Sequence, residues 1–381
     1  MPLKIARTFS NRTLPIGVDL GTSAVKMAQL RTGEDSAHLL AAGSADLTAA
    51  PRKDLASRQE IIGAAIRDIL RTNPFKGRKC ILCIPSDSVA VQHIRTPKLS
   101  HEDLARSLGA ELQGKLPFAV EDAIIRHVVA GDVYGEGDPQ QEVIIVAALR
   151  ETIESYLRMA GRAGLEVVGV NIEAFAVVEC FARLFRRASD AGRTILFVDI
   201  GAATTQVVLS HGNRPVFARN LAMGGEQLDQ SVAEGLSIPV EQARALRRDP
   251  HKMGQDSAAE NELYHLMDKP LLVMADELTQ CLRYYESVFR NQSVERAIFV
   301  GGQAYDKRLC QTLAQKLNLP AQVGDPLVRV GRVEGAGLDI GLDRREPQPN
   351  WAVAVGLSLG AAEAARDQSE NARSGTGTQA A

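Results

Sequence analysis

Short apolar blocks separated by Gly, Pro and Asp predict alternating strands and helices along most of the chain. The run Thr194–Ser210 predicts an apolar strand, a tight turn at Asp199-Ile-Gly201 and a second β-branched strand. Apolar residues at helical spacing predict an amphipathic helix over Ser57–Thr72. The runs Leu39–Leu47 and Cys80–Ile84 predict buried strands on either side of that helix. This order of elements indicates an α/β fold.

The stretch from Val89 to Gly169 has a different pattern and is large enough to form its own subdomain. The capping box Ser100-His-Glu-Asp103 predicts a helix that reaches to about Leu116. The other elements predicted here are strands over Val89–Thr96, Ile124–Val133 and Glu142–Leu149, and a helix over Arg150–Ala163. The order β-α-β-β-α therefore predicts a compact inserted subdomain.

The second half of the chain is richer in helices. The predicted helices run from about Val170 to Arg186, from Met223 onward, over Ile238–Arg247, over Pro270–Val288, over Asp306–Leu317 and over Trp351–Ala364. The segments predicted as loops are Asp249–Glu262 and Gly331–Pro349. The tail Asp367–Ala381 is rich in Ser, Gly, Thr and Gln, a composition typical of disorder.

The strand-Asp-x-Gly-strand pattern occurs twice. Ile16–Leu30 aligns without a gap on the second copy, with Asp19 on Asp199 and Gly21 on Gly201. Glycine lets a ligand approach the backbone, and a carboxylate at this point can hold a hydrated magnesium ion. A single such hairpin is often only structural. An internal repeat instead points to two related half-domains that close on a nucleotide.

A strand that ends in Gly301-Gly302 and leads into a helix is the third motif, and this double glycine can let the backbone lie flat against an adenine ring. The two Asp-x-Gly hairpins and this motif, in that order, resemble the nucleotide-binding motifs of the actin, sugar-kinase and heat-shock-chaperone superfamily. The resemblance implies a two-lobed, actin-like ATPase fold of class α/β, with duplicated half-domains around a nucleotide cleft.

Composition narrows the class of protein. A chain of 381 residues with 45% hydrophobic residues is long enough for two lobes. The net charge of −2, without a basic stripe, gives no support for binding nucleic acid. The pair Cys80-Ile-Leu-Cys83 lies in a strand-like run, so we interpret it as buried and not as a redox motif or a zinc site. No apolar run approaches the ~18 residues of a membrane span.

A more specific resemblance lies in the predicted insertion. The segment Glu111 to Asp122, which contains Leu116-Pro117-Phe118, resembles the helix-ending signature of the PilM family of type IV pilus assembly proteins. The resemblance extends from Ile16 to about Ala364. It implies a first lobe at 1–88, an inserted subdomain at 89–169, a linking helix at 170–193, a second lobe at 194–225 and 296–350 around a helical subdomain at 226–295, a return helix at 351–366 and a tail at 367–381.

The resemblance also implies that ATP and Mg²⁺ bind in the cleft. The residues it implies for the phosphates are Gly21, Thr22, Ser23, Lys26, Gly201, Thr204 and Thr205. Asp19 and Asp199 are implied behind the magnesium waters, and Gly301 and Gly302 against the base. The helix start at Gly224, Gly225 and Glu226, together with Arg247, is implied for the nucleotide, and Glu173 for the attacking water.

Two of these roles have alternatives, and one position leaves the nucleotide preference open. Lys26 can equally be a strand residue that pairs with an acid, and Glu173 can simply be an acid favoured at a helix N-terminus. Arg244 stands where relatives often have an acid that meets ribose or base, so the nucleotide preference stays open.

The function that the resemblance implies is a cytoplasmic ATP-binding scaffold at the inner membrane. Its partner would be the N-terminal cytoplasmic tail of a PilN-like membrane protein, held in the groove between the first lobe and the insertion. PilO-like proteins, pilus motor ATPases and a weak homo-oligomer are further implied partners, with no direct membrane insertion. The turns indicate ATP binding and leave the rate of hydrolysis open, from a weak ATPase to a hydrolase with fast turnover.

Two other functions compete with it. A filament protein similar to FtsA would carry an amphipathic membrane helix after its linker, whereas the tail Asp367–Ala381 has no large apolar residue. A small-molecule kinase of the superfamily would need a substrate-facing Asp base, and no sequence element nominates one. The sequence does not distinguish pilus assembly from type II secretion or competence systems.

Overall fold

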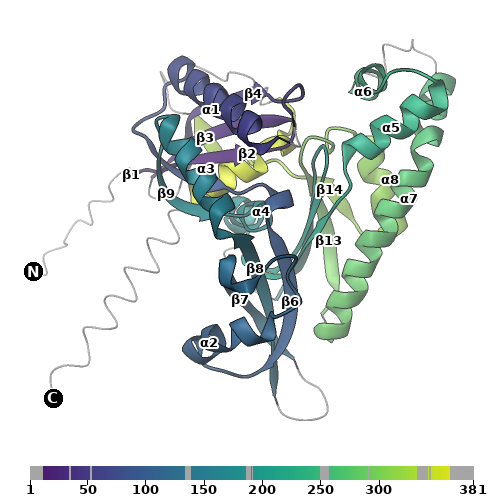
Figure 1. Ribbon diagram of the computed structural model, residues 1–381. Helices are drawn as coiled ribbons and strands as arrows, with labels where there is room; N and C mark the ends of the chain where they lie inside the picture. The colour runs from purple at the N-terminus through teal and green to yellow at the C-terminus, as the bar shows by residue number, and fades with distance from the viewer. Residues whose placement is uncertain are drawn as a thin grey trace, which may run out of the picture.

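The computed structural model describes residues 12–33, 36–51, 54–133, 139–185, 190, 192–248, 257–290, 292–332, 342 and 345–360. Two sheets of related topology form two lobes, and a third sheet lies below them (Figure 1). The first lobe has the order β15-β4-β3-β2-β5-β9, with β1 beside β3. Its strands are β1 (Arg12–Thr13), β2 (Ile16–Leu20), β3 (Ala24–Thr32), β4 (Ala37–Asp46), β5 (Lys79–Cys83), β9 (Glu166–Asn171) and β15 (Val330–Arg332).

The second lobe repeats the pairing of the first. Its sheet has the order β12-β11-β10-β13-β14, and its strands are β10 (Thr194–Ile200), β11 (Thr205–His211), β12 (Arg214–Leu221), β13 (Val294–Val300) and β14 (Ala321–Val323). In each lobe the Asp-bearing strand pairs antiparallel with the next strand and parallel with a later one. This shared topology confirms the predicted duplicated, actin-like α/β fold.

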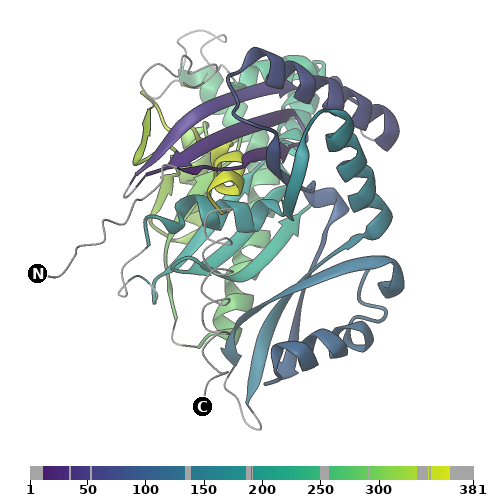
Figure 2. The same cartoon turned by 90° about the vertical axis from the view of Figure 1, so that its left-hand side faces the viewer.

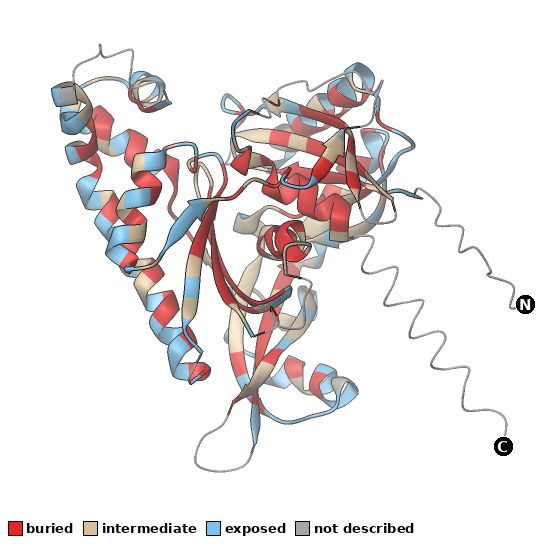
Figure 3. Ribbon diagram, turned by 180° about the vertical axis from the view of Figure 1, so that it is seen from behind, coloured by how far each residue is buried: buried red, intermediate tan, exposed pale blue. Residues whose placement is uncertain are grey.

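Buried helices join the two lobes. α4 (Glu173–Ala182) and the helix of residues 352–360 lie at the junction and are almost wholly buried (Figure 3). A Cβ on Gly356 would lie 1.8 Å from the Ala176 carbonyl oxygen, and one on Gly17 would lie 2.0 Å from that of Ala354. Because only glycine fits at these crossings, the return helix touches α4 on one side and strand β2 on the other.

The inserted sheet has the order β6-β8-β7, with β6 (Ala90–Pro97), β7 (Ala123–Val133) and β8 (Gln140–Leu149). α2 (His101–Glu111) covers one face of it, and Leu104, Leu108 and Leu112 pack on strand residues there (Figure 2). Ser100 accepts a hydrogen bond from the amide of Asp103, as the capping box predicts. The helix ends at Glu111 and not at Leu116, because turns occupy residues 112–118.

α3 (Arg150–Arg162), which the sequence places in the insertion, packs on the first lobe. Its buried residues Tyr156, Met159 and Ala160 meet α1 (Leu55–Thr72) in one core, and the β9 that follows pairs with β5. The sheet of the insertion therefore ends at Leu149, about twenty residues before the predicted boundary at Gly169.

The helices of the second lobe lie on its outer side. They are α5 (Gly225–Leu236), α6 (Val240–Arg248), α7 (Ser257–Val288) and α8 (Lys307–Leu317). α7 begins thirteen residues before the predicted start at Pro270, which lies inside it. Proline has no N–H to bond the Leu266 carbonyl, and the Ser231 hydroxyl of α5 donates to that oxygen instead at 2.6 Å. This contact helps the helix continue through the proline.

Other differences are small. β15 forms at the start of the predicted loop Gly331–Pro349, where it pairs with β4. The tail Asp367–Ala381, the end of the return helix and residues 249–256 of the first predicted loop lie outside the described residues. No described helix has the length and apolar character needed to cross a membrane.

Candidate functional site

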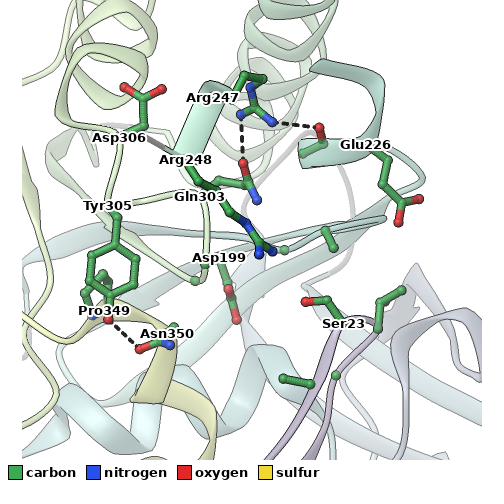
Figure 4. A pocket seen from close by; sticks show the side chains of 18 of the residues that line it. Ser23, Asp199, Glu226, Arg247, Arg248, Gln303, Tyr305, Asp306, Pro349 and Asn350 are labelled. Atoms are coloured by element: carbon green, nitrogen blue, oxygen red, sulfur yellow. Dashed lines mark hydrogen bonds between the residues drawn. The ribbon is translucent and has the colours of Figure 1, made fainter. Parts of the chain in front are cut away.

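The two Asp-x-Gly turns face each other across a cleft of about 960 Å³ between the lobes (Figure 4). Gly21 directly follows β2, and Gly201 directly follows β10. A Cβ on Gly21 would lie 2.9 Å from the Ala24 carbonyl oxygen, and one on Gly201 would lie 2.9 Å from that of Thr204. Both turns therefore need glycine, and both expose their backbone to the cleft.

Three carboxylates meet at the floor of this cleft. Asp19 comes from the first lobe, Asp199 from the second and Glu173 from the N-terminus of α4, and all three line the cavity. Lys26 donates to Asp19 Oδ2 at 3.2 Å. Lys26 pairs with this acid and also faces the cleft, and its side chain is only 16% exposed.

Burial and crowding disfavour the ionised carboxylates. Burial, followed by the Asp19 charge, raises the pKa of Asp199 to about 7, although Lys26 acts in the opposite direction. Burial, then Asp199 and Asp19, raises the pKa of Glu173 well above its usual value. Lys26 is the basic residue that offsets these raised pKa values, and the described residues contain no group of three His, Cys, Asp or Glu side chains that could ligate a metal ion directly.

The first residues of α5, which the resemblance implies for the nucleotide, bind the second Asp-x-Gly turn. The amides of Gly225 and Glu226 donate to the carbonyls of Gly201 and Ala202, at 3.0 and 2.8 Å. A Cβ on Gly224 would lie 2.7 Å from the Gly201 oxygen. These glycines thus dock the helix on the second turn, and the two amides already have protein partners.

Arg247 is also held by the protein. It is buried and donates to Asp229 Oδ1, to the Gly225 carbonyl at 3.0 Å and to Gln303 Oε1 at 2.8 Å (Figure 4). Arg244 donates to the other oxygen of Asp229 at 2.8 Å. Both arginines therefore brace α5 and α6 around one carboxylate while they line the cleft.

Gly301 lies directly above the second acid. Its φ is +89°, and a Cβ there would lie 2.3 Å from Asp199 Oδ1. Gly302 has no atom within 4 Å of its Cβ position, so its face is open to the cleft. The Tyr305 hydroxyl lies 2.8 Å from Asn350 Oδ1 beside this opening (Figure 4). Gln348 Oε1 lies 3.0 Å from the same hydroxyl.

The structure brings together most of the predicted site. The predicted residues that line the cleft are Asp19, Gly21, Thr22, Ser23, Lys26, Glu173, Asp199, Gly201, Thr204, Gly225, Glu226, Arg247, Gly301 and Gly302. Gly224 lies behind them. Thr205 is fully buried and donates to the Met223 carbonyl at 2.8 Å, so its hydroxyl does not reach the cleft.

Sequence reasoning missed several lining residues, among them Asp229, Arg248, Tyr264, Gln303, Tyr305 and Arg308. Tyr264 donates to Asp306 Oδ1, and the Arg308 guanidinium lies 4.1 Å from the Tyr264 ring centroid. Asp229 lies one helical turn after Gly225, and this spacing is only a weak indication that its side chain faces the cleft. The others come from elements whose relative placement the sequence does not give.

The duplicated sheets, the joining helices and the facing Asp-x-Gly turns define a protein with the actin-like ATPase fold. The family of type IV pilus assembly protein PilM matches residues 17–362. The chain belongs to this family.

Solved structures show the same fold. A PilM-PilN type IV pilus biogenesis complex is similar with a TM-score of 0.75 and 21% identity, over 91% of this chain and 98% of the other. MreB5 of Spiroplasma citri bound to ADP is similar with a TM-score of 0.51 and 12% identity, over 94% and 99%. The same MreB5 has also been solved bound to AMPPNP, with a TM-score of 0.52.

Curated relatives include the cell division protein FtsA of Bacillus subtilis, 19% identical over 279 residues. The match spans 68% of this chain but only 62% of that protein's length. FtsA of Borreliella burgdorferi is 20% identical over 72% of this chain and 70% of its own. Neither level of identity carries an activity over to this chain.

Proposed function

We propose that this chain binds ATP with Mg²⁺ in the interlobe cleft and acts as a cytoplasmic scaffold of the type IV pilus assembly platform. The observation that carries the proposal is the set of carboxylates between two facing glycine turns, in a chain of the PilM family. The carboxyl groups of Asp19 and Asp199, one from each lobe, fit a hydrated divalent cation, and the turns fit phosphates.

Individual residues take the following roles in this proposal. Lys26, Thr22, Ser23 and Thr204 hold the phosphates, and the turns at Gly21 and Gly201 give them close backbone contact. Asp19 and Asp199 hold magnesium through its water ligands, and the metal neutralises phosphate charge when bound. Gly302 offers an open surface for the base. Thr205 and Gly224 support these groups from behind, and Arg247 braces α5 and α6 at the wall of the cleft.

Glu173 is the residue placed to contact the attacking water in this proposal. Its raised pKa keeps the carboxyl protonated in the absence of a cation, and a protonated carboxyl is a poor base. Any hydrolysis would therefore depend on the bound metal and would be slow. A scaffold needs occupancy of the cleft more than it needs turnover.

The partner that we propose is the cytoplasmic N-terminal tail of a PilN-like inner-membrane protein. A PilM-PilN complex with the same fold supports this choice. The tail would lie in the groove between the first lobe and the inserted sheet, and would hold the chain at the membrane. PilO-like proteins, pilus motor ATPases and weak self-association are further contacts of such a platform.

A filament role similar to FtsA is the second candidate, favoured by the similarity to two FtsA proteins. Polymerisation in the presence of Mg-ATP, measured by light scattering and electron microscopy, distinguishes the two functions. We expect no filaments at micromolar protein, because the family that matches residues 17–362 is that of pilus assembly.

The test is a pair of calorimetric titrations on the full chain. Mg-ATP is titrated first, followed by a synthetic peptide of the N-terminal cytoplasmic residues of the PilN-like protein from the same genome. Asp19→Ala should abolish the first titration, whereas Asp68→Ala, which changes an exposed acid paired with Arg71, should not. Absence of ATP binding in the wild type would refute the cleft assignment, and absence of peptide binding would refute the proposed partner.

A further inference from the structure

The chain enters the inserted subdomain through a short turn that touches the nucleotide cleft. The 3-10 turn η1 (Ser86–Ser88) follows β5 and leads into β6. Ser86 Oγ lies 3.0 Å from Thr204 Oγ1, which belongs to the second lobe and lines the cleft. The pair therefore connects the second phosphate turn with the entrance of the insertion.

Ser86 has a second side-chain partner on its other side. Its hydroxyl also faces the carboxyl of Glu173, and hydrogen bonding from Ser86 lowers the pKa of that group against the larger effect of burial. Ser86 thus lies between Thr204 of the second lobe, whose hydroxyl is 3.0 Å away, and Glu173 at the start of α4. Thr204 and Glu173 both line the cleft, and Ser86 connects them.

Which hydroxyl donates and which accepts at Ser86 depends on what Thr204 binds. A hydroxyl has one proton to donate and can accept two hydrogen bonds. When Thr204 donates to a phosphate oxygen, it can only accept from Ser86. Ser86 then has no proton left for Glu173. In an empty cleft Thr204 can donate to Ser86, which can donate to an oxygen of the Glu173 carboxyl group. Phosphate binding therefore reverses one bond and weakens the other.

The inserted subdomain is in turn fixed to the second lobe. Asn220 on β12 donates to the carbonyls of Ser86 and Val89, at 3.2 and 3.4 Å. Further along β6, His93 Nε2 lies 3.0 Å from the Ala218 carbonyl, and its ring stacks on Phe217 with centroids 4.8 Å apart. Both the entrance and the first strand of the insertion are thus held by β12.

A buried charge completes this attachment. Glu142 of β8 is fully buried and binds His93, Arg95 and, from α7 of the second lobe, the Tyr284 hydroxyl. A buried carboxylate cannot leave such partners without a large cost. The insertion therefore moves with the second lobe, while its covalent connections at residues 84–89 and 149–150 run to the first lobe.

We propose that Ser86 is a positioning residue that transmits occupancy of the cleft by a nucleoside triphosphate to the inserted subdomain. This inference rests on the proposed function and specifies its regulation. Phosphate at Thr204 redirects the Ser86 hydroxyl, η1 shifts, and the insertion changes its position relative to the first lobe. The groove between these two parts then differs between the nucleotide-bound and nucleotide-free protein.

The experiment is hydrogen–deuterium exchange of the full chain with and without Mg-AMPPNP. We expect AMPPNP to slow exchange in residues 84–97 and 140–149 of the wild type by about fivefold or more, as for a coupling of ordinary size. Ser86→Ala should bind AMPPNP within about threefold of wild type but show less than about twofold protection there. Ser88→Ala is the matched control, because its hydroxyl donates to Asp87.

A second measurement uses the PilN-type peptide. Its Kd should change with Mg-AMPPNP in the wild type and in Ser88→Ala, and stay within about twofold in Ser86→Ala. If Ser86→Ala does not fold, Ser86→Cys replaces it, because a thiol is a weak donor of similar size.

The outcomes separate the two proposals. Equal responses in Ser86→Ala and the wild type, or equal losses in both serine variants, overturn the role of Ser86. AMPPNP binding to the wild type without any response in the insertion also overturns it and leaves the cleft assignment intact. No AMPPNP binding to the wild type refutes both.

Discussion

The carboxylate of Asp199 should destabilise the nucleotide-free protein, and Asp199→Asn tests this directly. The folded state raises the pKa of Asp199 from 3.8 to about 7 because the group is buried beside Asp19. An acid with a raised pKa binds its proton more tightly in the folded state. Stability therefore falls as pH rises from about 4 to about 7, and the loss is complete above that range.

The size of the effect follows from the same values. A difference of about three pKa units corresponds to about 4 kcal/mol of unfolding free energy at pH 8. The asparagine removes the charge but remains a buried amide that still loses its contact with water. We expect Asp199→Asn to recover about half of this energy, roughly 2 kcal/mol, and to raise Tm by a few °C. Mg-ATP binding should weaken about 10- to 100-fold, because the magnesium waters lose an ionised partner.

Urea denaturation of both proteins at pH 5 and pH 8, without nucleotide, measures the stability change. The variant should gain most at pH 8 and little at pH 5, where the wild-type group is already protonated. A matched Asp68→Asn variant, which changes an exposed carboxylate, should follow the wild type at both pH values. If Asp199→Asn is less stable than the wild type at pH 8, the carboxylates do not repel each other as argued.

Three further predictions concern other parts of the chain. Gly301→Ala should lower the unfolding free energy, measured by urea denaturation, by about 2 kcal/mol or more, because its Cβ would lie 2.3 Å from Asp199 at a φ of +89°. Gly302→Ala should keep wild-type stability but weaken nucleotide binding in calorimetry. Glu142→Ala should lose about 3 kcal/mol at pH 7.5 by leaving Arg95 and His93 without their acid. Because the folded state lowers the pKa of Glu142, the stability it gives the wild type should be lost as pH falls below about 4, so urea midpoints of wild type and variant should converge there. Cys80 and Cys83 should react with a thiol reagent only as fast as the protein unfolds, since burial raises the pKa of both thiols, that of Cys80 to about 12; fast labelling of the folded protein would contradict this.

Local sequence signals were enough to predict the two Asp-x-Gly turns. An Asp-x-Gly turn between β-branched strands is encoded in about fifteen consecutive residues, and both hairpins form in the register that the repeat predicts. The same holds for the strands of the insertion and for the Ser100 cap. Gly301 could be predicted because a strand-ending double glycine is also a local feature.

Longer-range packing was not encoded in this way. The apolar face of α3 does not by itself distinguish packing on the inserted sheet from packing on the first lobe. Only the structure shows that Tyr156 and Met159 pack with α1. Pro270 predicts a helix boundary by local rules, whereas Ser231 from another helix supplies the hydrogen bond that the proline cannot. The sequence does not show that Arg247 pairs with Asp229, because Asp229 lies eighteen positions earlier on another helix.

The cleft also explains why a metal–nucleotide complex would act on the arrangement of the lobes. Asp19 belongs to the first lobe, Asp199 to the second and Glu173 to the helix between them, so their mutual repulsion is largest when the lobes are close. A cation held between the carboxylates reverses the sign of that interaction and favours closure. Because the Glu142 network ties the insertion to the second lobe, closure must move the insertion relative to the first lobe. A tail bound between those two parts would therefore respond to the charge in the cleft without touching it.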